Sequence, residues 1–234
     1  MQSQKNSVHH RNRLTTQRGL SLLEMSITLL CVGLIVSMMI RGEELIVQTR
    51  IKAVAADFTG LRIAVSAYQD RYSRFPGDDD GAARWSGFGV NPVSGLGDGA
   101  FLGVYNAVPS NPPLPTEESN LFWWHLRLSQ ILTGPIDAAN GPRQPLNFIG
   151  GIIGAQGPNA GTLGLPNVVA CSSNLPARVA AAVDLSIDEG RANAGDMRGI
   201  RMALTGGGIP AAAPAANYDE SSGEDYVVCM GLTR

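Results

Sequence analysis

A single carboxylate interrupts the most apolar stretch of the sequence. Residues 20–40 read LSLLEMSITLLCVGLIVSMMI, and Glu24 is the one charged residue among them. A carboxylate inside an apolar membrane span costs roughly 3 kcal/mol on insertion scales, so such a residue indicates a function unless a partner relieves it. Two explanations could account for a lowered cost of Glu24 in this stretch. Glu24 lies shallow enough to reach the membrane interface, or it pairs with a positive charge, for which a new α-amino group created by cleavage near Gly19 is a candidate.

The acidic clusters further along the chain raise the question of a cation site. Asp78, Asp79 and Asp80 follow a Pro-Gly turn, and Asp184, Asp188 and Glu189 form a second group. Calcium requires several oxygen atoms that converge from one loop. Neither cluster has the D-x-D-x-D-G spacing of a calcium loop, so we expect solvated loops and no bound metal.

Catalytic motifs are absent from the sequence. His125 is the one histidine beyond residue 19, and a packed or surface position is expected for it within FWWHLRL. No G-x-S-x-G, H-E-x-x-H, Walker A or dinucleotide-binding motif occurs. One histidine and two cysteines in this region leave too few ligands for a zinc site. We therefore predict a protein that is not an enzyme and has no cofactor, while a hydrolytic site built from Asp and Glu alone stays open.

Two groups of side chains could serve as binding surfaces. Trp123 and Trp124 could form a patch, but a helical pattern places at least Trp124 in the core. Arg191, Arg198 and Arg201 form a local basic cluster. Residues 73–234 as a whole carry nine arginines against fifteen acidic residues, which argues against a nucleic-acid partner.

The apolar stretch that carries Glu24 has the length of a membrane span. Twenty-one helical residues nearly match a hydrocarbon core about 30 Å thick. Residues 1–19 contain four basic residues and no acid, so this flank is expected to stay cytoplasmic and the acidic remainder to be translocated. A cleaved signal peptide is the alternative, but it requires a small-residue A-x-A site, which RGEELIVQTR after Ile40 does not offer.

A helical pattern continues beyond the apolar stretch. Apolar residues alternate at spacings of four and three and define one helix face: Val47, Ile51, Val54, Phe58, Leu61, Val65, Tyr68 and Tyr72. We expect this face to dock on a globular head, with Pro76 ending the helix. A two-stranded coiled coil is the alternative, but this face lacks a leucine-rich seam with flanking charge pairs.

The remaining residues, from 73 onward, change in composition. They hold all 14 prolines and most of the 28 glycines, so this part must turn often. One helix is expected within PTEESNLFWWHLRLSQILTGP, with Thr116 as its cap, and another over about 176–188. Strands are expected in LNFIGGII, LGLPNVVAC, MRGIRMAL and YVVCMGL. The prediction is an α+β fold in which a long N-terminal helix packs on a head with an antiparallel sheet.

The start of the chain resembles a known export signal. The run QRGLSLLEMSITLL is similar to the type III, or prepilin, signal of type IV pilins and of the pseudopilins of type II secretion systems. The resemblance rests on the basic leader, Gly19, the apolar start and Glu24, and it covers about the first quarter of the chain. Leu20 stands where family members commonly have phenylalanine.

The resemblance implies a processing pathway. A membrane prepilin peptidase would cut between Gly19 and Leu20 and methylate the new amine of Leu20, which makes Glu24 the fifth mature residue and the assembly residue. The implied partners are other pilin or pseudopilin subunits, the peptidase, an inner-membrane assembly platform and, before assembly, membrane lipid. The implied localisation is the bacterial inner membrane, with the head periplasmic, followed by a filament in the periplasm or at the cell surface.

The cysteines fit an exported head. Cys171 and Cys229 lie on strand candidates in the translocated part and can pair there, which would close a loop of about 58 residues and stabilise the head by about 4 kcal/mol. Pilin-like heads often carry such a C-terminal bridge, and two buried unpaired thiols are the alternative. Cys31 lies in the apolar stretch, where we expect a buried free thiol.

The sequence therefore predicts three segments and one function. The segments are a leader over 1–19, a helix over 20–72 that spans the membrane to about residue 40, and a head over 73–234. The predicted function is that of a structural subunit, a minor pilin or a pseudopilin. The alternative is a membrane-anchored periplasmic enzyme or ligand-binding protein that uses the helix only as an anchor; replacement of Glu24 would distinguish the two.

Overall fold

The structure is a computed structural model of the 234-residue chain. It describes residues 19, 21–205, 208–209, 211–212 and 216–233. The chain divides into two compact units, Met1–Leu45 and Ile46–Arg234. One helix, α1, contributes to both units, and each unit is described by itself below.

Helix α1 runs from Leu22 to Tyr72. Ser21 begins it, because the Ser21 hydroxyl accepts a hydrogen bond from the Leu23 N–H at 3.3 Å, which satisfies one of the free donors at a helix start. No proline interrupts these residues. The helix ends where Ser73 adopts a positive φ of 53°, three residues before Pro76.

The apolar face of α1 in the second unit packs into the main core of the head. Val54, Phe58, Val65 and Tyr68 are almost completely buried there, and Val47 and Tyr72 pack at its margins. The predicted docked helix is thus confirmed for this unit.

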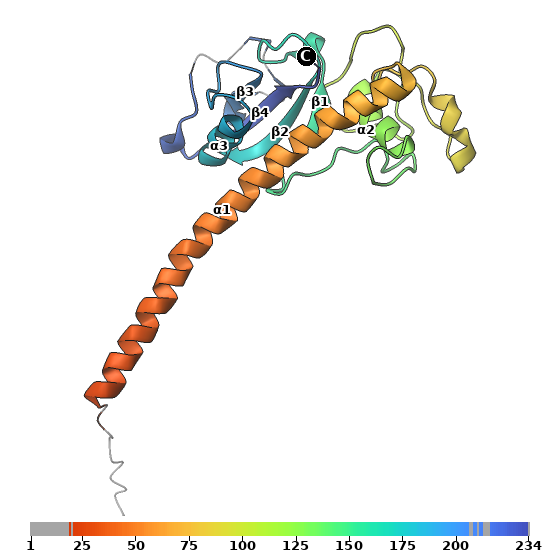
Figure 1. Ribbon diagram of the computed structural model, residues 1–234. Helices are drawn as coiled ribbons and strands as arrows, with labels where there is room; N and C mark the ends of the chain where they lie inside the picture. The colour runs from red at the N-terminus through yellow and green to blue at the C-terminus, as the bar shows by residue number, and fades with distance from the viewer. Residues whose placement is uncertain (1–18, 20, 206–207, 210, 213–215, 234) are drawn as a thin grey trace, which may run out of the picture. The chain divides into compact units, whose positions relative to one another are not determined.

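The sheet has four antiparallel strands in the order β1-β2-β4-β3 (Figure 1). The strands are β1 (Ile153–Gln156), β2 (Val169–Pro176), β3 (Met197–Arg201) and β4 (Asp225–Gly231). The central pair is β2 and β4, in which Cys171 lies opposite Cys229. A bulge shifts the register of this pair between Ser172 and Leu175, where Asn174 has a positive φ.

Both faces of the sheet are buried, and alternate residues serve each face. One face contributes Ala170, Val228 and Met230 to the main core, which also takes in the buried sides of α1, α2 (Glu118–Leu128) and α3 (Ala177–Ile187). The other face contributes Val169 and Val227, together with both cysteines, to a second cluster that Leu163, Leu165, Tyr105 and Ile209 cover. The α+β class with an antiparallel sheet is therefore as predicted.

Two of the four expected strands are displaced. LNFIGGII was expected to be a strand, but most of it forms a tight turn, and β1 begins at Ile153. Asn147 causes this, because its side-chain oxygen accepts hydrogen bonds from the N–H groups of Ile149 and Gly151. LGLPNVVAC overlaps β2 only over its last three residues. Local side-chain hydrogen bonds and glycines thus override the apolar pattern.

The predicted boundaries of α2 were also too wide. The helix begins at Glu118 after Glu117, and Thr116 does not cap it. It ends at Leu128 rather than near Gly134, since Gln130 adopts a positive φ of 62° and the chain turns there. Four short 3-10 helices complete the described elements: η1 (Ala82–Phe88), η2 (Pro158–Ala160), η3 (Met202–Leu204) and η4 (Glu220–Ser222).

Cys171 and Cys229 form a disulfide between the two central strands, and both residues are completely buried. The bond joins residues 58 apart in the sequence. It fixes the C-terminal strand to β2, so β4 is held both by main-chain hydrogen bonds and by a covalent link.

Candidate functional site: the apolar start of helix α1

The first half of α1 exposes apolar side chains around its whole circumference. Leu22, Leu29, Leu30, Met38 and Met39 are each about two-thirds exposed or more. A helix that is apolar on all sides is stable only within a protein core or a lipid bilayer. This helix is long and apolar enough to span a membrane, and no part of its most apolar window is buried within the chain itself.

The hydroxyl groups in this stretch are satisfied within the helix. Ser26 donates to the Leu23 carbonyl at 2.8 Å, Thr28 to the Met25 carbonyl at 2.9 Å, and Ser37 to the Gly33 carbonyl at 2.9 Å. Such bonds remove the need for water or for an outside partner. The small polar residues therefore place no demand on the surroundings.

Glu24 differs from these hydroxyls. It lies in the first turn of α1 and is exposed. Among the residues that the structure describes, its carboxylate has neither a hydrogen bond nor an ion pair. In an apolar medium, this charge requires a partner from elsewhere.

The position of Glu24 also suits a structural role. Ser21 and Glu24 have the S-x-x-E spacing of a capping box, and an acid in the first turn interacts favourably with the helix dipole. Sequence reasoning did not weigh this role, although the spacing is legible in the sequence. Any test of Glu24 must therefore separate its charge from an effect of its side chain on the helix start.

The other predicted residues of this segment are placed only in part. Gly19 is described and exposed, whereas Leu20, the predicted site of cleavage and methylation, and the leader 1–18 lie outside the described residues. Cys31 is a free cysteine, and it is exposed in the single chain rather than buried as expected.

The three consecutive aspartates of the head point to three different places. Asp79 is completely buried and accepts hydrogen bonds from the Tyr68 hydroxyl at 2.5 Å and from both terminal nitrogens of Arg84 at 2.6 and 3.0 Å. These bonds hold the pKa of Asp79 below its usual value despite its burial. Asp80 forms an exposed ion pair with Arg74 at 3.1 Å. The cluster therefore fastens the end of α1 to the head and does not form a single acidic site.

Asp78 belongs to a group of carboxylates that sequence reasoning missed. Oxygen atoms of Asp78, Asp98 and Glu118 lie within 4.8 Å of one another, and these residues come from three separate segments. Such a set could contribute to a site for a hard cation. The same oxygens already accept main-chain hydrogen bonds: Asp78 from the N–H groups of Asp98 and Gly99, and Glu118 from those of Leu96 and Leu102. No residue spacing in the sequence predicts this grouping.

Glu118 has an unusual proton affinity. Burial raises its pKa, the two main-chain donors oppose this shift, and the nearby carboxylates of Asp78 and Asp98 add to it, so that the pKa is about 7. The group titrates near neutral pH. It is the clearest candidate for a pH effect on the head.

The second acidic cluster fixes loops. Asp184 accepts hydrogen bonds from the Tyr218 hydroxyl at 2.7 Å and the Gly190 N–H at 2.9 Å, and Asp188 accepts from the Met197 N–H at 3.2 Å. Glu189 faces Arg191 at 3.6 Å. Two residues of the predicted basic cluster are likewise engaged: Arg198 donates to the Leu163 carbonyl, and Arg201 pairs with Asp219 and Glu224.

His125 and both tryptophans belong to the core. His125 is completely buried; its Nδ1 accepts a hydrogen bond from the Gly77 N–H, and its Nε2 lies 2.9 Å from the Val93 carbonyl. Burial lowers the pKa of His125, so it is neutral. Trp123 and Trp124 are both buried, and the Trp124 indole donates to the Ile136 carbonyl. Both ring nitrogens of the histidine are thus occupied by the main chain.

Comparison with protein-family models, with curated proteins and with solved structures finds no match to this chain.

Proposed function

We propose that this chain is a structural subunit of a pilin-like filament, of the minor-pilin or pseudopilin kind. In this proposal a prepilin peptidase cuts after Gly19, and the first half of α1 holds the subunit in the inner membrane. The subunit then joins a filament by helix packing. The long head, rich in glycine and proline loops, favours a minor subunit over the bulk subunit of a fibre.

The observation that carries the proposal is an exposed apolar helix whose one carboxylate has no partner among the described residues. Before assembly, lipid would surround this helix. Afterwards, other copies would surround it, and packing between helices would replace lipid contacts. Both environments exclude water, so both suit the exposed apolar surface of this helix.

Glu24 would set the register of assembly. After cleavage, the new α-amino group of one subunit would meet the Glu24 carboxylate of a neighbour that is displaced along the filament. A charge pair in a dry medium gains little net stability, because desolvation opposes the Coulomb attraction. Its main effect is directional, since a misplaced neighbour would leave a buried charge unpaired.

Two substitutions separate the charge of Glu24 from an effect of its side chain on the helix start. Glutamine can replace glutamate in a capping box but carries no charge. We expect both Glu24→Gln and Glu24→Ala to abolish filaments in the native host, seen by electron microscopy of sheared filaments. Ser26→Ala, a matched change two residues away, should leave them intact.

The mass of the processed chain must be measured in each variant, because an uncut precursor would also fail to assemble. Normal filaments from a correctly cut Glu24→Gln variant would show that the charge is not required and would overturn the proposed charge pair. If Glu24→Ala also assembles normally, Glu24 has no role in assembly.

A further inference from the structure

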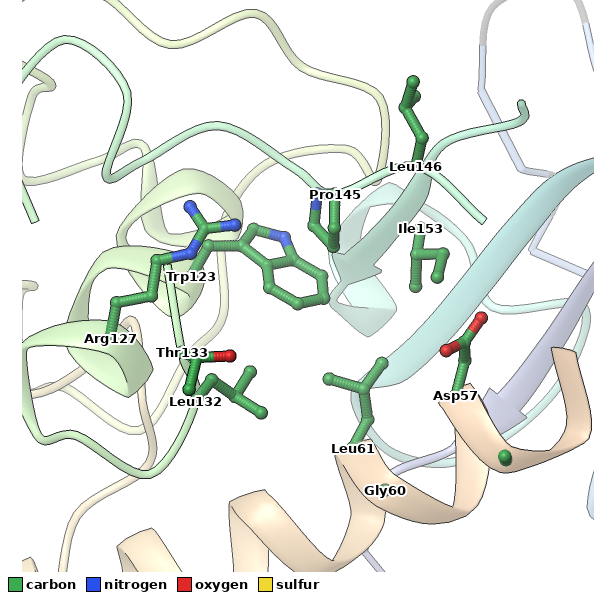
Figure 2. A pocket seen from close by; sticks show the side chains of 11 residues that line it. Asp57, Gly60, Leu61, Trp123, Arg127, Leu132, Thr133, Pro145, Leu146 and Ile153 are labelled. Carbon is green, nitrogen blue, oxygen red and sulfur yellow. The ribbon is translucent and has the colours of Figure 1, made fainter. Parts of the chain in front are cut away.

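A pocket in the head lies where α1, α2 and the turn before β1 meet. Its volume is about 270 Å³, and its apolar lining includes Leu61, Leu132, Pro145, Leu146 and Ile153. Figure 2 shows these side chains around an open space, with Trp123 on one side and Asp57 on the other. Ligand pockets usually measure about 300–1,000 Å³. This pocket therefore suits one or two inserted side chains better than a free ligand.

Asp57 is an unusual residue for such a place. It projects from α1 into the pocket lining and is half-buried. Within the described residues its carboxylate has no hydrogen bond and no ion pair. Burial raises the pKa of Asp57, so its charge is held at a cost. A cation brought to the pocket would relieve that cost.

Two exposed apolar side chains flank Asn147 in the turn that contributes Leu146 to the pocket lining. Leu146 and Phe148 are 66% and 63% exposed. Asn147 lies between them, is buried, and donates hydrogen bonds to the Ser172 hydroxyl and the Ser173 carbonyl at 2.8 Å each. This anchoring fixes the turn that carries Leu146 and Phe148, and both side chains are left exposed. A fixed apolar pair loses little entropy when a partner covers it.

The same segment carries an exposed arginine side chain. Arg143, two residues before Pro145, is exposed, and its Nε donates to the Ala139 carbonyl at 3.0 Å. Among the described residues it has no acidic partner. Its carbonyl accepts a hydrogen bond from Arg127, a pocket-lining residue, at 2.8 Å, which ties the segment to the pocket wall. The pocket wall and the segment bonded to it thus carry an acid and a base without an ionic partner among the described residues, together with two exposed apolar side chains.

We propose that this surface, formed by Asp57, Arg143, Leu146, Phe148 and the pocket between α1 and α2, is a self-complementary contact for a second copy of the chain. In an isologous pair, each copy offers the same patch, so residue i of one meets residue j of the other and the reverse. Arg143 of each copy then faces Asp57 of the other, and Leu146 and Phe148 of each cover the apolar lining opposite. The contact needs neither Glu24 nor the apolar start of α1, so it is independent of filament assembly.

The test measures the dimer of the full chain in detergent micelles. Glu24→Gln is present in every sample to prevent filament formation. Analytical ultracentrifugation over a concentration series gives the dissociation constant, which for a patch of this size we expect on the order of micromolar or weaker. Asp57→Arg and Arg143→Asp should each weaken the dimer by about tenfold or more, because each brings like charges together. The double variant restores opposite charges and should return the constant to about the parent value.

Apolar substitutions provide the second arm. Leu146→Ser together with Phe148→Ser should abolish the dimer, whereas Leu185→Ser, at an equally exposed position on α3, should leave it unchanged. Thermal unfolding checks each variant; if Asp57→Arg unfolds the head, Asp57→Asn replaces it and should weaken the dimer as well. A monomeric parent, an unchanged constant in the single charge variants, or a double variant that stays weak would each overturn the proposal.

Discussion

At the scale of single residues, neighbours in the sequence have unlike surroundings. Asp79 and Asp80 are adjacent, yet Asp79 is completely buried among four donors and Asp80 is half-exposed beside Arg74. A buried carboxylate that loses its charge leaves its donors unsatisfied, whereas an exposed ion pair contributes little.

We therefore expect Asp79→Asn to lower the free energy of unfolding by about 3 kcal/mol. Asp80→Asn, the matched control, should lower it by less than about 1 kcal/mol. Chemical denaturation of both variants measures the difference. Equal effects would contradict the buried network of Tyr68, Asp79 and Arg84.

Glu118 predicts a pH dependence with a definite sign. Its pKa in the folded chain, about 7, lies above the ordinary value of 4.5, so the folded state binds its proton more tightly than the unfolded state does. The stability that Glu118 contributes is complete below pH 4.5 and is lost as the pH rises to 7, by up to roughly 3 kcal/mol. Glu118→Gln should remove this fall, which unfolding curves at several pH values would detect. A variant with the same pH profile as the parent would contradict the shifted pKa.

At the scale of elements, the sequence predicted a local helix pattern better than it predicted features that depend on turns or long-range contacts. The apolar spacing from Ile51 to Tyr68 predicted a docked helix face because periodicity is a local property. The strands at 146–153 and 163–171 were misplaced because Asn147 and several glycines turn the chain there. The grouping of Asp78, Asp98 and Glu118 could not be predicted, since only the fold brings these three segments together.

The buried face of α1 provides the element-scale prediction. Phe58 is almost completely buried in the main core, whereas Ile63 on the same helix is 64% exposed. Phe58→Ala should lower the free energy of unfolding of the head by about 3–5 kcal/mol, because it removes buried apolar surface and leaves a cavity. Ile63→Ala should change it by less than about 1 kcal/mol. Similar losses for both would indicate that this half of α1 does not pack as described.

At the scale of the whole molecule, the described residues of the two units differ in how far their apolar side chains are buried. The head has a two-sided sheet, a buried disulfide and a docked helix face. In the apolar start of α1, by contrast, no part of the most apolar window is buried within the described residues. The sequence predicted this contrast, because the apolar run and the proline-rich remainder differ in composition. It did not predict the proposed self-complementary patch.

In the proposed function, cleavage after Gly19 creates the amine with which Glu24 pairs on a neighbouring copy. This cleavage can be checked by intact-mass and N-terminal peptide mass spectrometry of the chain purified from its native host. We expect a chain that begins at Leu20, with a methyl group on its amine. A chain that still begins at Met1, or one cut beyond the apolar stretch, would contradict it.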